Sequence, residues 1–211
     1  MRKSLALIVI CALLFWNWQA KRSFQVKTAI PAEYPGRYTY DHPIDNTPYQ
    51  NEINPDGKSY PYGEYQFSPL AEFQVRARVL GVMHYSLGRE SDLSPVDLAL
   101  GWGPMAEPAI IDSIQISQGG RFYMWRSENP PLPAREISRH SANMHFIPAN
   151  MQVTRELMRV ESGDTVRFRG YLVEISGMDG WKWRSSLTRN DTGNGACEVV
   201  LVDDLTVFKD S

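Results

Sequence analysis

Cysteine is scarce in this chain of 211 residues, which contains only Cys11 and Cys197. Cys11 lies within a hydrophobic stretch near the N-terminus, whereas Cys197 lies near the other end of the chain. Because a disulfide needs its two Cα atoms within about 7 Å, we do not expect these residues to be bridged. The fold is therefore expected to rest on its hydrophobic core.

A strong charge of one sign is also missing, since the formal net charge is -2. This balance argues against a protein that holds nucleic acid through a large overall positive potential, although it is compatible with a local basic face. Hydrophobic residues make up 43% and charged residues 22% of the chain, as in ordinary globular proteins and unlike disordered ones. At this length we expect one domain with additional segments.

The hydrophobic run near the N-terminus, Leu5 to Trp18, is shorter than the roughly 20 apolar residues of a typical transmembrane helix. Arg2 and Lys3 precede it, and a basic segment followed by an apolar one is the order of an export signal. Trp18 stands where a cleavable signal needs a small residue, while tryptophan suits the membrane interface. We therefore expect residues 1–22 to form an uncleaved signal-anchor.

Three other interpretations of this segment stay open. The signal is cleaved after Ala20, or Cys11 is lipidated although Ile10 stands where lipoprotein signals have a small residue, or the segment is an apolar helix buried against the domain. Basic residues lie on both sides of the segment, so they do not fix its orientation. We expect a membrane-anchored protein whose soluble domain lies on the non-cytoplasmic side, periplasmic or extracellular.

Residues 23–70 form a linker rich in proline and tyrosine, without regular hydrophobic periodicity. Repeated proline argues against a continuous helix or a central strand. A solvated spacer is normally poor in aromatic residues, so the tyrosines favour an irregular arm that lies on the domain. A strap that binds a partner is the functional alternative. The residues concerned are Pro31, Pro35, Pro43, Pro48, Pro55, Pro61, Pro69, Tyr34, Tyr38, Tyr40, Tyr49, Tyr60, Tyr62 and Tyr65.

Residues 71–211 have the alternation typical of β-strands. Apolar and polar side chains alternate over residues 73–79, which predicts a long strand with one buried face. The sequence from Ser94 to Asp97 has a serine, then a proline, then an acid three residues after the serine, and this pattern is typical of a capped helix start. We expect that helix to run through Leu100 and to stop at Gly101.

Further elements are expected downstream. Isoleucines from Ile110 to Ile116 and the segment from Arg121 to Trp125 indicate two strands joined by a turn at Gly119 and Gly120. Asn150 or a nearby residue opens a short amphipathic helix. The pattern then predicts a strand over 165–175, a hairpin at 178–180, an extended segment over 181–187, a polar loop over 188–195 and a final strand over 197–208.

The order strand, insertion, strand, strand, helix, strand, strand resembles the OB-fold, a five-stranded Greek-key barrel, over residues 71–208. Gly163 to Val173 and Glu198 to Val207 are similar to the last two strands of such barrels. The expected fold class is mainly β with one or two short helices in a small Greek-key barrel. An SH3-like barrel or a small sandwich is the alternative. The resemblance implies a binding role by analogy alone.

Arginine and tryptophan form the first candidate site. Two arginines lie on one side of the first strand and two on one side of the fourth, and these strands are neighbours in an OB-type barrel. Such a patch can hold an anionic ligand through charge-assisted hydrogen bonds. The alternative is an ordinary solvated strand face, neutralised by Glu72, Glu174 and Glu198. The residues concerned are Arg76, Arg78, Arg167, Arg169, Trp181 and Trp183.

The polar loop from Arg184 to Gly195 is the second candidate. It is dense in hydroxyl, amide and glycine residues, which suits ligand contact and equally suits a long turn. If this loop binds a ligand, Arg189 and Asp191 are the residues expected to do so.

A catalytic alternative uses Cys197 as nucleophile, His140 or His145 as base and Asp191 as orienting acid. The two histidines are five residues apart, so they fall on opposite faces of a strand. A cysteine at the start of an apolar strand is usually buried and inert. We predict no catalysis, no cofactor and no metal.

The expected protein is thus a membrane-anchored accessory or binding protein that contacts a protein partner or an anionic ligand. Nucleic acid is not expected as a ligand if the domain is exported. The competing function is an envelope hydrolase.

Overall fold

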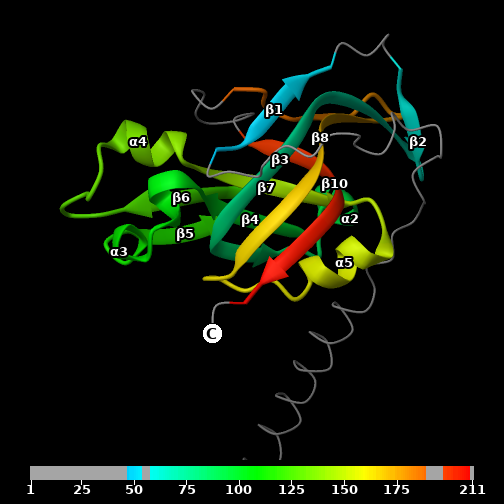
Figure 1. Ribbon diagram of the computed structural model, residues 1–211. Helices are drawn as coiled ribbons and strands as arrows, with labels where there is room; N and C mark the ends of the chain where they lie inside the picture. The colour runs from blue at the N-terminus through cyan, green and yellow to red at the C-terminus, as the bar shows by residue number, and fades with distance from the viewer. Residues whose placement is uncertain (1–46, 54–57, 189–196, 210–211) are drawn as a thin grey trace, which may run out of the picture.

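A computed structural model describes residues 47–53, 58–188 and 197–209, and these are mainly β-strand (Figure 1). The segment that the sequence predicts to be a signal-anchor lies outside the described residues. Within the described ranges, no helix is long and apolar enough to span a bilayer. The strands are β1 (Tyr49–Glu52), β2 (Tyr60–Tyr62), β3 (Tyr65–His84), β4 (Val96–Gly101), β5 (Gln115–Gly119), β6 (Phe122–Arg126), β7 (Ser141–Pro148), β8 (Thr165–Gly177), β9 (Lys182–Arg184) and β10 (Glu198–Phe208).

Short helices join several of these strands, more of them than the one or two that the sequence predicts. They are α2 (Arg89–Leu93), the 3-10 helix η1 (Gly103–Ala106), α3 (Pro108–Ile111), α4 (Ala134–Arg139) and α5 (Met151–Leu157).

The main sheet is mixed, and its pairings return to the strand at which they start. β3 pairs with β4, β4 with β7, β10 with β8 and β8 with β3, all antiparallel, while β7 and β10 are parallel. β1 and β2 add to β3, and β9 adds to β8. Strands β5 and β6 form a separate two-stranded sheet, which lies with α3 and α4 beside the main sheet (Figure 1).

β3 confirms the predicted long strand, but it begins at Tyr65 and includes the end of the predicted linker. The expectation that proline excludes a central strand was wrong at Pro69, which lies opposite Val173 in the pairing with β8. The register shifts between Pro69 and Ala71, and such a bulge tolerates a residue without a backbone N–H. Two further linker segments, β1 and β2, also pair with β3, whereas residues 23–46 and 54–57 lie outside the described part.

The predicted helix from Ser94 through Leu100 was wrong, because Val96–Gly101 is the central strand β4. All residues of β4 are buried between β3 and β7, so burial of both faces outweighs the local capping pattern. The Ser94 hydroxyl, which was expected to cap a helix, instead donates to the carbonyl oxygen of Val96 at 3.3 Å.

The predicted hairpin is confirmed as β5 and β6, but Ile110 and Ile111 belong to helix α3. This hairpin is an insertion outside the main sheet. The places in the main sheet that the sequence assigns to it are taken by β4 and β7. The sequence did not predict β7 as a strand. Its polar residues Asn143 and His145 are nevertheless buried, because the hairpin and β9 cover that face.

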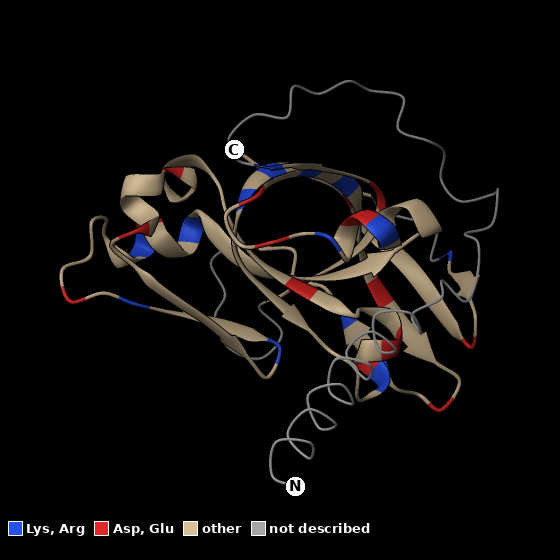
Figure 2. Ribbon diagram, turned by 90° about the horizontal axis from the view of Figure 1, so that it is seen from below, with Lys and Arg blue, Asp and Glu red and all other residues tan. Residues whose placement is uncertain are grey.

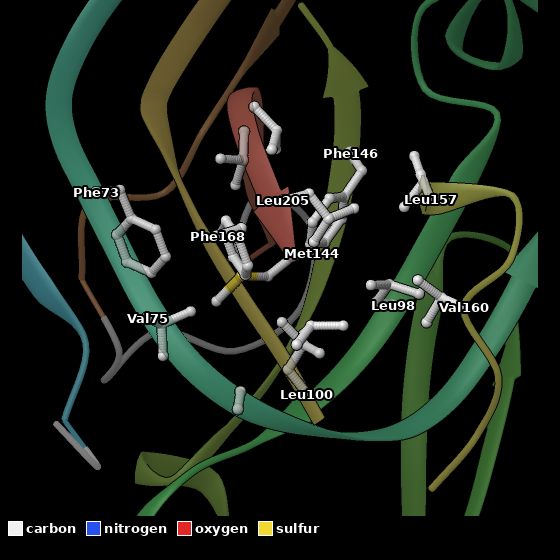
Figure 3. Close-up of a cluster of buried hydrophobic side chains, with 14 of the residues drawn as sticks. Phe73, Val75, Leu98, Leu100, Met144, Phe146, Leu157, Val160, Phe168 and Leu205 are labelled. Carbon is white, nitrogen blue, oxygen red and sulfur yellow. The ribbon is translucent and has the colours of Figure 1, made fainter. Parts of the chain in front are cut away.

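The helix that Asn150 was expected to open is α5, and the predicted strands that became β8 and β10 are confirmed. The Asn150 side chain accepts a hydrogen bond from the backbone N–H of Val153 at 2.9 Å, as an N-cap residue does. The largest hydrophobic cluster lies within the ring of paired strands, where side chains such as Phe73, Phe146 and Phe168 meet (Figure 3). Leu157 of α5 packs against the same cluster.

Two smaller hydrophobic clusters cover the outer faces of the strands. One contains Tyr65, Tyr171 and Ile175, with Trp181 and Trp183 packed against it. The other, centred on Ala99 and Met105, lies beneath the inserted hairpin and its helices. Outer-face residues of β4 and β7 therefore face the insertion rather than solvent.

Candidate functional site

The four predicted arginines lie on the directly paired strands β3 and β8, and we call Arg76, Arg78, Arg167 and Arg169 the basic strip. Arg76 is opposite Arg167, Arg78 is opposite Thr165, and Arg169 is opposite Gln74. The expectation that the two strands are neighbours is thus confirmed. Figure 2 shows Lys and Arg positions on the curved strands of the main sheet.

Arg76 and Arg167 form a like-charged cross-strand pair at the centre of this strip. Both are exposed, and within the described part of the chain neither makes an ion pair. The Arg76 guanidinium instead lies 5.6 Å from the centroid of the Phe208 ring. Like charges directly opposite on a sheet are destabilising, so the fold carries this pair at some cost in stability.

The basic strip ends beside two acidic residues of β10. Arg169 Nε lies 3.6 Å from Asp204 Oδ2, and both side chains are about two fifths exposed. The register of β10 against β8 shifts between Val202 and Asp204, which leaves Asp203 at the irregularity. Burial raises the pKa of Asp203 to about 7, against a lowering effect of Arg169 and with a smaller raising effect of Asp204. This carboxyl therefore changes its charge close to neutral pH.

The predicted tryptophans do not belong to the strip. Trp183 is opposite Ile175, eight residues beyond Arg167 along β8, or roughly 26 Å of extended strand. Trp181 contacts Trp183, with ring centroids 6.3 Å apart. These registers place the tryptophans far along β8 from the arginines, so the two groups do not form one patch.

The glutamates that were expected to neutralise the strip have other partners. Glu174 accepts hydrogen bonds from Arg184 at 2.8 Å and from Lys182 at 3.2 Å, and these bonds lower its pKa, that from Arg184 most. Glu72 accepts from Asn51 Nδ2 at 3.2 Å, and Glu198 is buried. Arg189 and Asp191 of the polar loop lie outside the described residues.

A second polar group, which the sequence did not predict as a site, lies on the outer face of β4 and β7. We call Asp97, Arg121, Asn143 and His145 the Asp97 cluster. The Asp97 side chain is fully buried, and it lies opposite His145 in the strand pairing. His145 Nδ1 is 2.9 Å from Asp97 Oδ1, but the contact is not aligned as a hydrogen bond.

Arg121 joins this cluster from the turn between β5 and β6. Gly119 pairs with Phe122, so Gly120 and Arg121 are the two turn residues, with φ angles of 58° and 71°. Positive φ at both positions is typical of the type I′ hairpin turn, although the second position usually holds glycine. Arg121 Nη1 donates to Asp97 Oδ1 at 2.8 Å and to the carbonyl oxygen of Ser94 at 3.1 Å.

Two aromatic rings flank the Arg121 guanidinium. Its central carbon is 4.0 Å from the ring centroid of Tyr85 and 5.5 Å from that of Trp183. Trp183 also covers the His145 ring at 4.9 Å between centroids. The Glu174 bonds to both neighbours of Trp183 in β9 help to hold this indole against the cluster.

The residues of the catalytic alternative are only partly brought together. Cys197 Sγ lies 3.6 Å from the carbonyl oxygen of Arg121, so it borders the cluster that contains His145. His140 is at the end of α4, where its Nδ1 is 2.9 Å from the carbonyl oxygen of Glu136. Among the described residues, no three His, Cys, Asp or Glu side chains are placed to hold a metal ion.

One sequence signal could have revealed the Asp97 cluster. Val96, Leu98 and Leu100 alternate with Asp97 and Ala99, and a single acid in an otherwise apolar strand pattern indicates a paired buried charge. No local pattern indicates that Arg121 is its partner.

Comparison with known proteins adds no relative from which a role could be transferred. No family model matches this chain, and neither a curated protein nor a solved structure matches it.

Proposed function

We propose that this protein is a membrane-anchored binding protein that holds an anionic ligand on the basic strip of its β domain, facing away from the cytoplasm. The observation that carries the proposal is the exposed pair of Arg76 and Arg167, which stand opposite each other without an ion pair among the described residues. An anion placed between them would relieve their repulsion. Guanidinium groups bind phosphate, sulfate and carboxylate through paired hydrogen bonds.

The strand pairings support an OB-type Greek-key barrel as the carrier of this surface. The order β3, β4, β7, β10, β8 and back to β3, with β7 and β10 parallel, corresponds to the strand order of that fold. Helix α5 lies between the third and fourth of these strands in sequence, as the OB-fold pattern requires. The barrel supports a binding role by analogy, and the residues of the strip supply the chemistry.

The anchor is supported by the sequence, in which a basic segment precedes the apolar run from Leu5 to Trp18. A domain tethered in this way meets acidic lipids, glycans and the acidic surfaces of envelope proteins. All three present the same anionic chemistry to the strip.

The test is a double variant, Arg76→Gln with Arg167→Gln, in the detergent-solubilised full chain. Binding is measured by fluorescence anisotropy with a labelled sulfated oligosaccharide, and by co-sedimentation with vesicles that contain an anionic phospholipid. We expect at least a tenfold loss of affinity for whichever probe binds, with the salt dependence of binding reduced.

The matched control is Arg135→Gln with Arg155→Gln, which removes the same charge from exposed positions on α4 and α5. Equal loss of binding in both double variants would show that only net charge matters, and it would contradict the proposal. Unchanged binding in the Arg76 and Arg167 variant would do the same.

A hydrolase that uses Cys197 is a second candidate, favoured by the position of Cys197 beside the cluster that contains His145 and Asp97. Cys197→Ala and His145→Ala should then each abolish hydrolysis of an activated ester by the full chain. Equal, slow hydrolysis by the variants and the unaltered protein would remove this candidate.

A further inference from the structure

The groups that surround the Arg121 side chain have the composition of a site for a guanidinium group. Its floor is a fully buried carboxylate, and the carbonyl oxygen of Ser94 and the hydroxyl of Ser91 are acceptors at its edge. The faces of Tyr85 and Trp183 form its walls. A guanidinium is planar, carries N–H donors around its edge and stacks on aromatic faces, so each part of the site matches one part of the group.

In this structure the group is supplied by Arg121 of the same chain. Besides the contacts to Asp97 and Ser94, Arg121 Nη2 donates to Ser91 Oγ at 3.2 Å. Its backbone is held as well, since its N–H donates to Tyr85 Oη at 3.0 Å and its carbonyl oxygen accepts from Asn143 Nδ2 at 3.0 Å.

The backbone of Arg121 is strained by this placement. A non-glycine residue at φ 71° lies in the left-handed region, which L side chains rarely adopt. The side-chain contacts of Arg121 and the hydrogen bonds of its backbone help to offset this strain. The hairpin that carries Arg121 belongs to a separate two-stranded sheet, so the residue is presented to the main sheet by an appended element.

Arg121 does not use the whole site. Asp97 Oδ1 receives the bond from Arg121 Nη1, whereas the equally buried Oδ2 has no hydrogen-bond donor among the described residues. A guanidinium that binds a carboxylate side-on uses both oxygens through two parallel bonds. The side chain of Arg121 is 18% exposed, so the site borders solvent.

From these contacts we propose that Asp97 and the groups that surround the Arg121 guanidinium form an arginine-binding site, which Arg121 fills in this chain and which an arginine side chain of a partner protein can fill in its place. The incoming guanidinium would take the bonds to Asp97, Ser94 and Ser91 and stack between Tyr85 and Trp183. Displacement frees the hairpin tip. This site is distinct from the basic strip and selects a ligand of the opposite charge.

The alternative role for Arg121 is a latch that only fastens the hairpin. A latch and a site respond differently to a guanidinium supplied from solution, because only a site accepts one that is not attached to the hairpin. The experiment therefore uses the full chain with Arg121→Ala and follows thermal unfolding with and without ~10 mM N-acetyl-arginine amide. This concentration is far below those at which guanidinium denatures proteins.

We expect Arg121→Ala to lower the melting temperature, and N-acetyl-arginine amide to restore about 3 °C of it if the dissociation constant is about 1 mM. N-acetyl-citrulline amide has the same shape without the charge and should restore nothing. The double variant Arg121→Ala with Asp97→Asn should not respond to either compound. Equal effects of the arginine and citrulline compounds on folded Arg121→Ala would overturn the proposal.

If Arg121→Ala does not fold, Arg121→Lys keeps the charge and removes the fork of donors. N-acetyl-arginine amide should then stabilise this variant more than it stabilises the unaltered protein, and the absence of that difference would equally overturn the proposal. The Arg76→Gln and Arg167→Gln variant should respond to the arginine compound as the unaltered protein does. Failure of the anionic-ligand proposal therefore leaves this result unaffected.

Discussion

The basic strip on β3 and β8 and the Asp97 cluster over β4 and β7 both place arginine on the outer side of the main sheet, but in opposite surroundings. Arg121 is largely buried, and it is matched by an acid, two serines and two aromatic rings. Arg76 and Arg167 are exposed and face each other. Arg121 thus makes many contacts within the fold, whereas Arg76 and Arg167 expose their charges to solvent.

We expect the largest loss of stability from a substitution at Asp97. Asp97→Ala leaves the Arg121 guanidinium partly buried without its acid, and breaking such a pair costs about 3–5 kcal/mol. The free energy of unfolding, measured with urea, should fall by this amount. A loss below about 1 kcal/mol would show that the Asp97 cluster contributes little to the stability of the fold.

The acid at the end of the strip comes next. The pKa of Asp203 in the folded protein, about 7, is above the ordinary value of 3.8, so folding favours the protonated form. Its stabilising contribution is complete below about pH 4 and is lost as the pH rises through 7.

Asp203→Asn should therefore be more stable than the unaltered protein at pH 8, on the order of 2 kcal/mol, and equal to it below pH 4. Denaturation at several pH values gives the measurement. A difference that does not change with pH would show that Asp203 titrates normally.

A smaller effect is expected at Asp204, the surface counterpart of Asp97. Its contact with Arg169 is 3.6 Å long and exposed, and surface pairs of this kind contribute about 0–1 kcal/mol. Asp204→Ala should change the unfolding free energy by no more than that. A loss as large as that of Asp97→Ala would erase the contrast between the two regions.

The smallest expected effect has the opposite sign. Arg76→Gln removes one member of the like-charged pair and should raise the unfolding free energy by about 0.2–0.5 kcal/mol at low salt. High salt should abolish the gain, because it screens exposed charges. Destabilisation by this substitution would instead indicate that the packing of Arg76 on Phe208 stabilises the fold.

Much of the fold could be predicted from local patterns, and the failures have physical causes. The strands β8 and β10 and the Asn150 cap were predicted correctly because period-two alternation and capping are local signals. β4 was mistaken for a helix because its capping pattern is also local, whereas the pairing that overrides it joins β4 to the distant β7.

The site residues also divide into those that local patterns predict and those that depend on distant contacts. Arg76 and Arg167 could be proposed as neighbours because the expected strand order brings β3 and β8 together. Trp183 was misplaced because its position depends on the length of β8 before it turns into β9. Arg121 could not be paired with Asp97, because the insertion folds back onto β4 through contacts that no periodicity encodes.

The pairing of β10 has a consequence for the time at which the domain forms. β3 and β8 can associate as soon as both have been synthesised, but the ring closes only when β10 inserts between β7 and β8. β7 pairs in parallel with a strand that begins 50 residues after its own last residue, and contacts of such separation form slowly. Until Phe208 is in place, β7 and β8 each present an unpaired edge. The domain can therefore complete its fold only after β10 has been synthesised.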